Sequence, residues 1–158
     1  METERDRTAA RSNERYGDTL AEKLGKLVGA TFILVGILGF IPGITTNYDE
    51  LTTFDHEGAK LLGIFGVNII ENIVHLLFGV VGIMMSRTWS GARTFLIGGG
   101  LIYLVLWLFG LVIDKDSSAN FMGLNSESDW LHLVLGIALL ALGFLVGRDR
   151  DRSAAATA

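Results

Sequence analysis

Residues 68–85 read NIIENIVHLLFGVVGIMM, and residues 125–142 read NSESDWLHLVLGIALLAL. Each stretch opens with polar residues, places one histidine just inside an apolar run, and has a glycine one helical turn later. At one constant offset the matched pairs are Asn68 and Asn125, Asn72 and Asp129, His75 and His132, and Gly79 and Gly136. The sequence therefore predicts an internal duplication.

A second, looser match extends the repeat to the apolar block that precedes each stretch. It aligns Gly29, Phe32, Gly36 and Gly39 with Gly100, Tyr103, Trp107 and Gly110. One unit is then a helix, an outer loop and a second helix, and the chain contains two units in the same orientation. Parallel repeats of this kind imply a pseudo-two-fold axis along the membrane normal.

The fold class follows from the distribution of charge. Half of the residues are hydrophobic and 19% are charged, and the charges lie almost wholly outside four long apolar blocks. Each block is near the roughly 20 residues that a helix needs to cross a bilayer, and a lone strand there would leave its backbone groups unpaired. We predict an all-α membrane protein whose domain spans residues 24–147, with four transmembrane helices at about residues 26–44, 68–86, 92–113 and 129–147.

The flanking segments are predicted to be disordered cytoplasmic tails, residues 1–23 and 148–158, because they are rich in charge and poor in apolar side chains. A short helical lead-in over residues 19–26 is expected at the inner membrane surface. Acidic residues interleave with the basic ones in both tails, which argues against nucleic acid as a partner.

Lysine and arginine set the predicted orientation. Eleven of them lie in the two tails and the middle connection, and only Lys60 and Lys115 lie in the other two connections. Basic residues concentrate on the cytoplasmic side of membrane proteins. The sequence therefore predicts a multi-pass protein of the cell (cytoplasmic) membrane with both termini in the cytoplasm. It has no cysteine, which excludes disulfides and thiolate metal sites.

The start of the second helix is ambiguous, because residues 61–85 form one apolar block. The register of the second copy resolves it, since its matching polar residues precede the apolar run. Asn68 is then an N-cap, and Glu71 completes a capping box near the outer headgroups. Residues 61–67 are predicted to be an interfacial or re-entrant piece.

The histidines carry the one candidate site. Residues three apart share a helix face, so Asn72 lies beside His75, and Asp129 beside His132. If the second and fourth predicted helices meet, both histidines lie at similar depth near the outer leaflet. His75, His132 and Asp129, with Glu71, would then form a reasonable shell for zinc or another divalent metal.

The favoured interpretation of the same residues is structural. Polar side chains such as Asn68, Asn72 and Asn125 can hydrogen-bond between helices, and Gly79 and Gly136 allow close helix contact. Haem between the two histidines is disfavoured, because their surroundings are acidic and offer no basic partners for propionates. With no credible nucleophile beside a histidine and acid, no enzyme activity is predicted.

Three stretches carry a family resemblance: VNIIENIVHLLFGVVGI, FLIGGGLIYLVLWLFGLVID and NFMGLNSESDWLHLVLGIALLALG. Over about residues 24–146 the chain resembles a bacterial family of small four-helix membrane proteins, the domain-of-unknown-function family 4383. The paired His-Leu-x-x-Gly motifs are the most specific part. The resemblance implies a four-pass inner-membrane protein, and it supplies no activity, cofactor or catalytic residue.

Three functional hypotheses follow. The leading one is a non-enzymatic helix bundle in the lipid bilayer that acts by association with itself or with other membrane proteins. The alternative is a protein that binds a metal or small ligand through the outer-leaflet histidine pair. A small transporter ranks third, because a four-helix bundle is narrow and no helix has a clear charge at mid-depth.

Overall fold

The structure is a computed structural model that describes residues 19–54 and 58–156. In these ranges it is dominated by four α-helices, which are α2 (Leu20–Leu38), α3 (Ile69–Met85), α4 (Trp89–Val112) and α5 (Ser126–Ala156). The long connection between α2 and α3 adds a short 3-10 helix, Tyr48–Glu50, and three short strands, which are β1 (Thr45–Thr46), β2 (Lys60–Leu61) and β3 (Phe65–Gly66). The predicted tail lies outside the described residues over positions 1–18.

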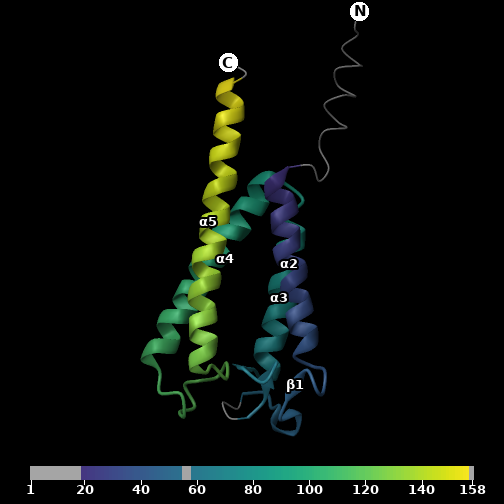
Figure 1. Ribbon diagram of the computed structural model, residues 1–158, viewed down its shortest axis with the longest axis vertical. Coiled ribbons are helices and arrows are strands. Elements are labelled where there is room, and N and C mark those ends of the chain that lie inside the picture. The colour runs from purple at the N-terminus through teal and green to yellow at the C-terminus, as the bar shows by residue number, and fades with distance from the viewer. Residues whose placement is uncertain (1–18, 55–57, 157–158) are drawn as a thin grey trace, which may run out of the picture.

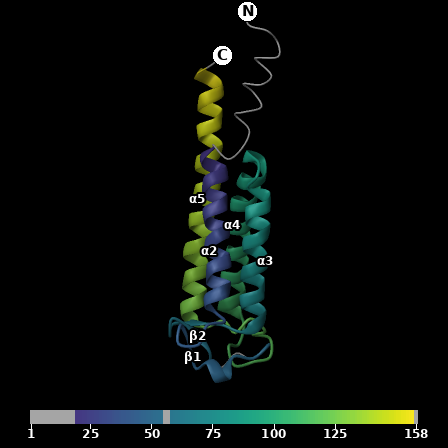
Figure 2. The same ribbon diagram turned by 90° about the vertical axis from the view of Figure 1, so that its right-hand side faces the viewer.

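The helices form two antiparallel pairs. α2 packs along α3, and α4 packs along α5, while the main contact between the pairs joins α2 to α4. α2 and α5 lie on one side of the molecule, with α3 and α4 on the other (Figures 1 and 2). The start of α2 and the end of α5 lie at one end of the bundle, and the strands lie at the opposite end (Figure 1).

α2 begins earlier than predicted because Thr19 closes a capping box. The Thr19 hydroxyl accepts from the Glu22 amide at 3.3 Å, and the Glu22 carboxylate accepts from the Thr19 amide at 3.2 Å. The helix then runs without a break to Leu38, so residues 20–26 are its first turns and not a separate lead-in. Residues 20–23 of the predicted tail are therefore ordered.

α2 also ends earlier than predicted, at Leu38 rather than near residue 44. The hydroxyl of Thr45 folds back and donates to the carbonyls of Leu38 and Gly39, at 3.2 and 3.1 Å. The Leu38 carbonyl also accepts from the Ile41 amide at 3.1 Å, so Thr45 adds a second bond there and gives the Gly39 carbonyl a partner at the helix end. A turn through Pro42 then leads into β1.

Residues 61–67 lie outside α3, as predicted, and build a hairpin that the sequence analysis missed. β2 pairs antiparallel with both neighbours, Leu61 facing Thr45 on β1 and Phe65 on β3. Leu62 and Gly63 form the tight turn with positive φ angles of 55° and 72°. The predicted helical fold class is confirmed, and residues 61–67 contribute to a small three-stranded sheet in the first loop.

α3 begins after Asn68, whose side-chain oxygen accepts from the Glu71 amide at 2.8 Å. The predicted N-cap is confirmed. The Glu71 carboxyl group does not return to the cap, and it lines the cleft described below.

α5 continues to Ala156, beyond the predicted end at residue 147. After Gly147 the sequence RDRDRSAAA has no glycine or proline, and its arginines and alanines favour helix. The predicted tail is therefore helical over residues 148–156.

Within the described ranges, two helices are long and apolar enough to cross a bilayer, Trp89–Val112 and the Ser126–Arg148 part of α5. α3 is also apolar and has 17 residues. α2 has 19 residues, and its first turns carry Glu22, Lys23 and Lys26. Length and composition alone thus mark two spans out of the four that the sequence predicts.

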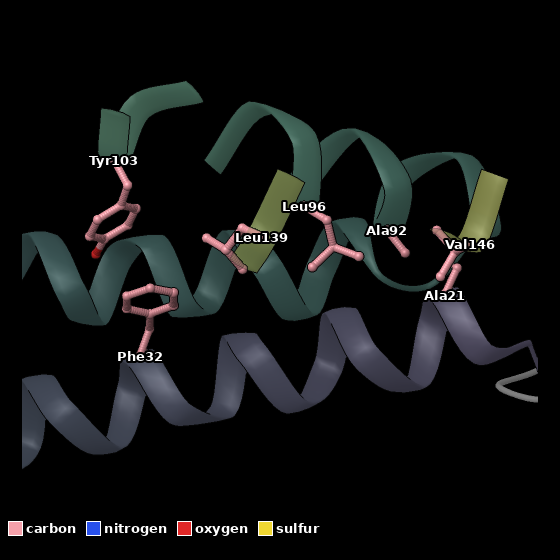
Figure 3. Close-up of a cluster of buried hydrophobic side chains, with 7 residues drawn as sticks. All are labelled: Ala21, Phe32, Ala92, Leu96, Tyr103, Leu139 and Val146. Atoms are coloured by element: carbon pink, nitrogen blue, oxygen red, sulfur yellow. The ribbon is translucent and has the colours of Figure 1, made fainter. Parts of the chain in front are cut away.

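A cluster of buried apolar side chains joins the two helix pairs. Its members come from α2, α4 and α5 and are Ala21, Phe32, Ala92, Leu96, Tyr103, Leu139 and Val146. Figure 3 shows Phe32 pointing from α2 toward Tyr103, close to one end of this cluster. The position matters because both rings also border the candidate site.

Candidate functional site

The predicted glycines lie at close helix contacts inside each pair. A Cβ atom added at Gly79 would lie 2.5 Å from the Gly29 carbonyl oxygen, and one added at Gly136 would lie 3.1 Å from that of Gly100. Either helix would have to move to make room. Gly29 and Gly100 are aligned with each other in the repeat, so matched glycines make matched contacts. The packing role predicted for Gly79 and Gly136 is therefore supported.

Asn72 and Asp129 face the partner helix of their own pair. Asn72 lies against Gly39 and Asp129 against Gly110, again at matched positions. The Asp129 carboxylate accepts from the Lys115 ammonium group at 2.6 Å, and that group also donates to the Gly110 carbonyl at 2.7 Å. Asp129 is thereby committed to an ion pair at the loop end of α4.

The two N-cap asparagines connect the pairs to each other. The Asn68 amide donates to the Phe121 carbonyl at 2.8 Å, and the Asn125 amide donates to the Ile64 carbonyl at 2.7 Å. Each asparagine thus starts a helix in one pair and holds the outer loop of the other pair. The hydrogen bonds predicted for Asn68 and Asn125 are present, between loop and helix rather than between helices. The bond predicted for Asn72 is not, because neither polar atom of its side chain has a partner among the described residues.

A row of aromatic rings separates the two histidines. The His75 ring stacks on Phe32 with centroids 5.7 Å apart, Phe32 stacks on Tyr103 at 5.5 Å, and Tyr103 meets the His132 ring at 5.2 Å. Phe32 and Tyr103 occupy matched positions in the repeat, as do the histidines. Read from either pair, the row therefore passes through the same matched positions, with Phe32 in the first unit and Tyr103 in the second.

These rings border a cleft of about 420 Å³ between α2 and α5. Its walls are mostly apolar side chains of these two helices, and Leu61, Phe65 and Val67 of the first outer loop close one end. Polar groups come from all four helices: Thr31, Glu71, His75, Tyr103, Ser128 and His132. Such a volume lies within the range of roughly 300–1,000 Å³ that is usual for small-molecule sites.

Three polar atoms in this cleft are buried and have no hydrogen-bond partner among the described residues. They are Glu71 Oε2, His75 Nδ1 and His132 Nδ1. The Glu71 and His132 residues are each only 3% exposed. A buried polar atom without a partner costs about 1–3 kcal/mol, so these atoms mark a place where a ligand could supply the missing bonds.

The four predicted metal ligands do not form one shell. Glu71, His75 and His132 border the same cleft, but Asp129 is turned toward Lys115, and aromatic rings lie between the histidines. Among the described residues, no three His, Cys, Asp or Glu side chains lie close enough to hold a metal ion. The metal site is corrected because α2 and α4, and not α3 and α5, make the main contact between the pairs.

Several residues of the site were not singled out from the sequence. Phe32 and Tyr103 were aligned in the repeat, but nothing in one sequence shows that they stand between the histidines. Gly66 and Gly123 share the offset of the histidine pair, and a Cβ at Gly66 would clash with the Gly123 carbonyl. The shared offset marked the two glycines as equivalent positions in the two units, but it gave no sign that they meet.

The described chain is thus a helical protein with two membrane-length helices and an apolar cleft that has polar groups on its floor. Residues 23–145 match the family described as Domain of unknown function (DUF4383), and the chain belongs to this family. No curated protein and no solved structure matches the chain.

Proposed function

We propose that the chain is a four-pass integral membrane protein of the cytoplasmic membrane, built by tandem duplication of a two-helix unit, with both termini in the cytoplasm. It is not an enzyme, and it binds a small ligand in the cleft between α2 and α5. The sequence offered this as its alternative, a protein that binds a metal or small ligand through the histidine pair, and we propose the small ligand.

Four spans are supported by packing and surface composition. α2 and α3 lie alongside the two helices that pass the length and composition test (Figure 2). Large apolar side chains are exposed on the outside of all four helices, including Leu34, Leu77, Val105 and Ile137. An aqueous surface would disfavour them, whereas a bilayer would cover them.

The ligand proposal rests on the unpartnered polar atoms of Glu71, His75 and His132, three residues that line the cleft. Two of the three belong to side chains that are 3% exposed, so these groups are removed from solvent without a partner among the described residues. Sites with mostly apolar walls and a few convergent polar groups are typical of small-molecule binding.

Association with itself or with other membrane proteins stays a prediction. Gly79 and Gly136, which motivated it, make their contacts within the chain. Contact with lipid by itself accounts for the exposed apolar side chains, so they give no separate support for a protein partner.

The ligand proposal is tested by native mass spectrometry of protein extracted from its own membranes in mild detergent. Ala138 lines the cleft with an exposed side chain, so Ala138→Trp fills the cleft without displacing a packed residue. Val105→Trp is the matched control, because Val105 is 63% exposed and does not line the cleft. We expect a bound small molecule on wild type and on Val105→Trp that is lost from Ala138→Trp.

Wild-type protein that carries no small molecule would count against a resident ligand. Equal occupancy in Ala138→Trp and wild type would place any bound molecule outside the cleft, which would refute the proposal.

A further inference from the structure

We propose that the ligand is a neutral amphiphile, consisting of a single hydrocarbon chain and a compact head with two or more hydroxyl or carbonyl oxygens. This inference rests on the proposed ligand-binding function and specifies its ligand class. Such a head chemistry is shared by membrane quinols and by monoacylglycerols.

Four of the six polar residues that line the cleft lie toward its loop end: Glu71, His75, Ser128 and His132. On α5, Ser128 and His132 lie nearest the outer loops, and Leu135, Leu139 and Leu142 follow along the same cleft toward the other end of the helix. Glu71 and His75 also lie in the first turns of α3, at the loop end. The head of an amphiphile would therefore lie beneath the first outer loop, and its chain would run along α2 and α5.

The length of the cleft suits a chain of moderate size. Ser128 and Leu142 both line it, and at 1.5 Å per helical residue they are about 21 Å apart. On α2 the lining runs from Val35 near the loops to Leu27 further along. These walls are apolar apart from Thr31, so they fit hydrocarbon rather than a second polar group.

The residues around the head argue against an anion. None of the described residues that line the cleft is a lysine or arginine, so no cation there would offset a phosphate or carboxylate. Anionic phospholipids and fatty acids are thus poorly suited to the cleft.

The unpartnered atoms also define the hydrogen bonds that the head must make. Glu71 Oε2, His75 Nδ1 and His132 Nδ1 come from two different helices, α3 and α5. A hydroxyl group can both donate and accept, and an imidazole nitrogen can do either according to its tautomer. A head with two oxygens can therefore hydrogen-bond to the unpartnered atoms of both α3 and α5. A quaternary ammonium head has no hydrogen-bond donor or acceptor and could bond to neither.

The test compares probes that share a ten-carbon chain and differ in the head. Wild-type protein in phosphatidylcholine nanodiscs is titrated with decyl-1,4-benzoquinol, 1-monodecanoylglycerol, decanoate and decyltrimethylammonium, and occupancy is measured by native mass spectrometry. We expect saturable one-to-one binding of a neutral probe at concentrations where the charged probes do not bind. Preference between the two neutral probes tells a quinol source from a lipid source.

The variant His75→Phe with His132→Phe keeps the ring volume and removes the hydrogen bonds. Binding of the preferred neutral probe should weaken about tenfold, the equivalent of losing one or two hydrogen bonds. Ala138→Trp provides a second test should the double variant fail to fold, because it leaves the buried rings untouched. The control Val105→Trp should bind as wild type does.

The outcomes separate this inference from the proposed function. Tighter binding of decanoate or decyltrimethylammonium, abolished by Ala138→Trp, would overturn the neutral-head inference and leave a ligand cleft in place. Binding of a neutral probe that is insensitive to both cleft variants would overturn the inference as well. If no probe binds and wild type carries no resident molecule, both proposals fail.

Discussion

Asn72 and Asp129 occupy matched places in the two helix pairs, each against a glycine of the neighbouring helix, yet one is neutral and the other acidic. The difference follows from Lys115, which reaches Asp129 across the second outer loop. The residue aligned with Lys115 in the first unit is Ile44, which carries no charge. At this pair of matched positions, a carboxylate therefore occurs only in the second unit, where a cation pairs with it.

This pairing predicts a rescue. Lys115→Met should destabilise the protein by about 3 kcal/mol, because it leaves the 6%-exposed Asp129 side chain without its partner. Adding Asp129→Asn should recover most of the loss, since it recreates the neutral arrangement of Asn72. Denaturant unfolding in detergent micelles measures both.

Lys60→Met is the control, because Lys60 is the exposed lysine of the other outer loop and should change the stability by less than about 0.5 kcal/mol. No loss in Lys115→Met, or no recovery in the double variant, would show that the ion pair has little part in stability.

At the scale of single residues, the sequence predicted which residues have a structural role better than it predicted which partners their side chains contact. The N-cap at Asn68 and the close contacts of Gly79 and Gly136 depend on local helix geometry, and the structure has them. The metal shell depended on which helices face one another, and a repeat does not encode that. Asp129 was assigned to it although its partner, Lys115, lies only 14 residues earlier in the chain.

At the scale of the elements, each helix pair is held together by glycines at matched positions. Gly29 and Gly79 let α2 and α3 approach, and Gly100 and Gly136 do the same for α4 and α5. In lipid the hydrophobic effect does not drive helices together, so van der Waals packing at such close backbone contacts stabilises the pair instead. The helices themselves were predictable from their apolar lengths and caps.

The pairing predicts that Gly79→Leu costs at least about 2 kcal/mol, because the new side chain meets the Gly29 backbone and Ile33. Gly98→Leu on α4 is the matched control, since a Cβ at Gly98 meets nothing within 4 Å. It should be neutral or slightly stabilising through its better helix propensity. Thermal unfolding of both variants in the same detergent compares them, and equal effects would refute glycine-mediated pairing.

The elements that escaped prediction depend on contacts made outside their own sequence. At the end of α2, Thr45 returns after a turn and donates to the carbonyls of Leu38 and Gly39, while Pro42 has no amide hydrogen with which to continue the helix. The hairpin of β2 and β3 depends on the left-handed backbone of Leu62, a conformation that leucine rarely adopts. Neither feature has a periodic pattern that would reveal it.

At the scale of the molecule, the two helix pairs contact each other mainly through α2 and α4, and the cleft lies between α2 and α5. The outer loops close this arrangement, because each N-cap asparagine bonds to the loop of the other pair. The repeat in the sequence predicted two similar units. The orientation of one unit relative to the other, which creates the cleft, depends on side-chain packing and could not be predicted from one sequence.

The structure places both loops at one end of the helical bundle, and the four-pass proposal predicts that this end faces the outside of the cell (Figure 1). Cysteine labelling tests this prediction directly because the chain has no cysteine of its own. Thr53→Cys and Ser118→Cys introduce single exposed thiols in the two outer loops, and Ser90→Cys places one in the first turn of α4 at the opposite end. In spheroplasts, a membrane-impermeant maleimide should label the two loop variants at once and Ser90→Cys only after permeabilisation. Labelling of Ser90→Cys in intact spheroplasts, or of only one loop variant, would contradict the four-pass account.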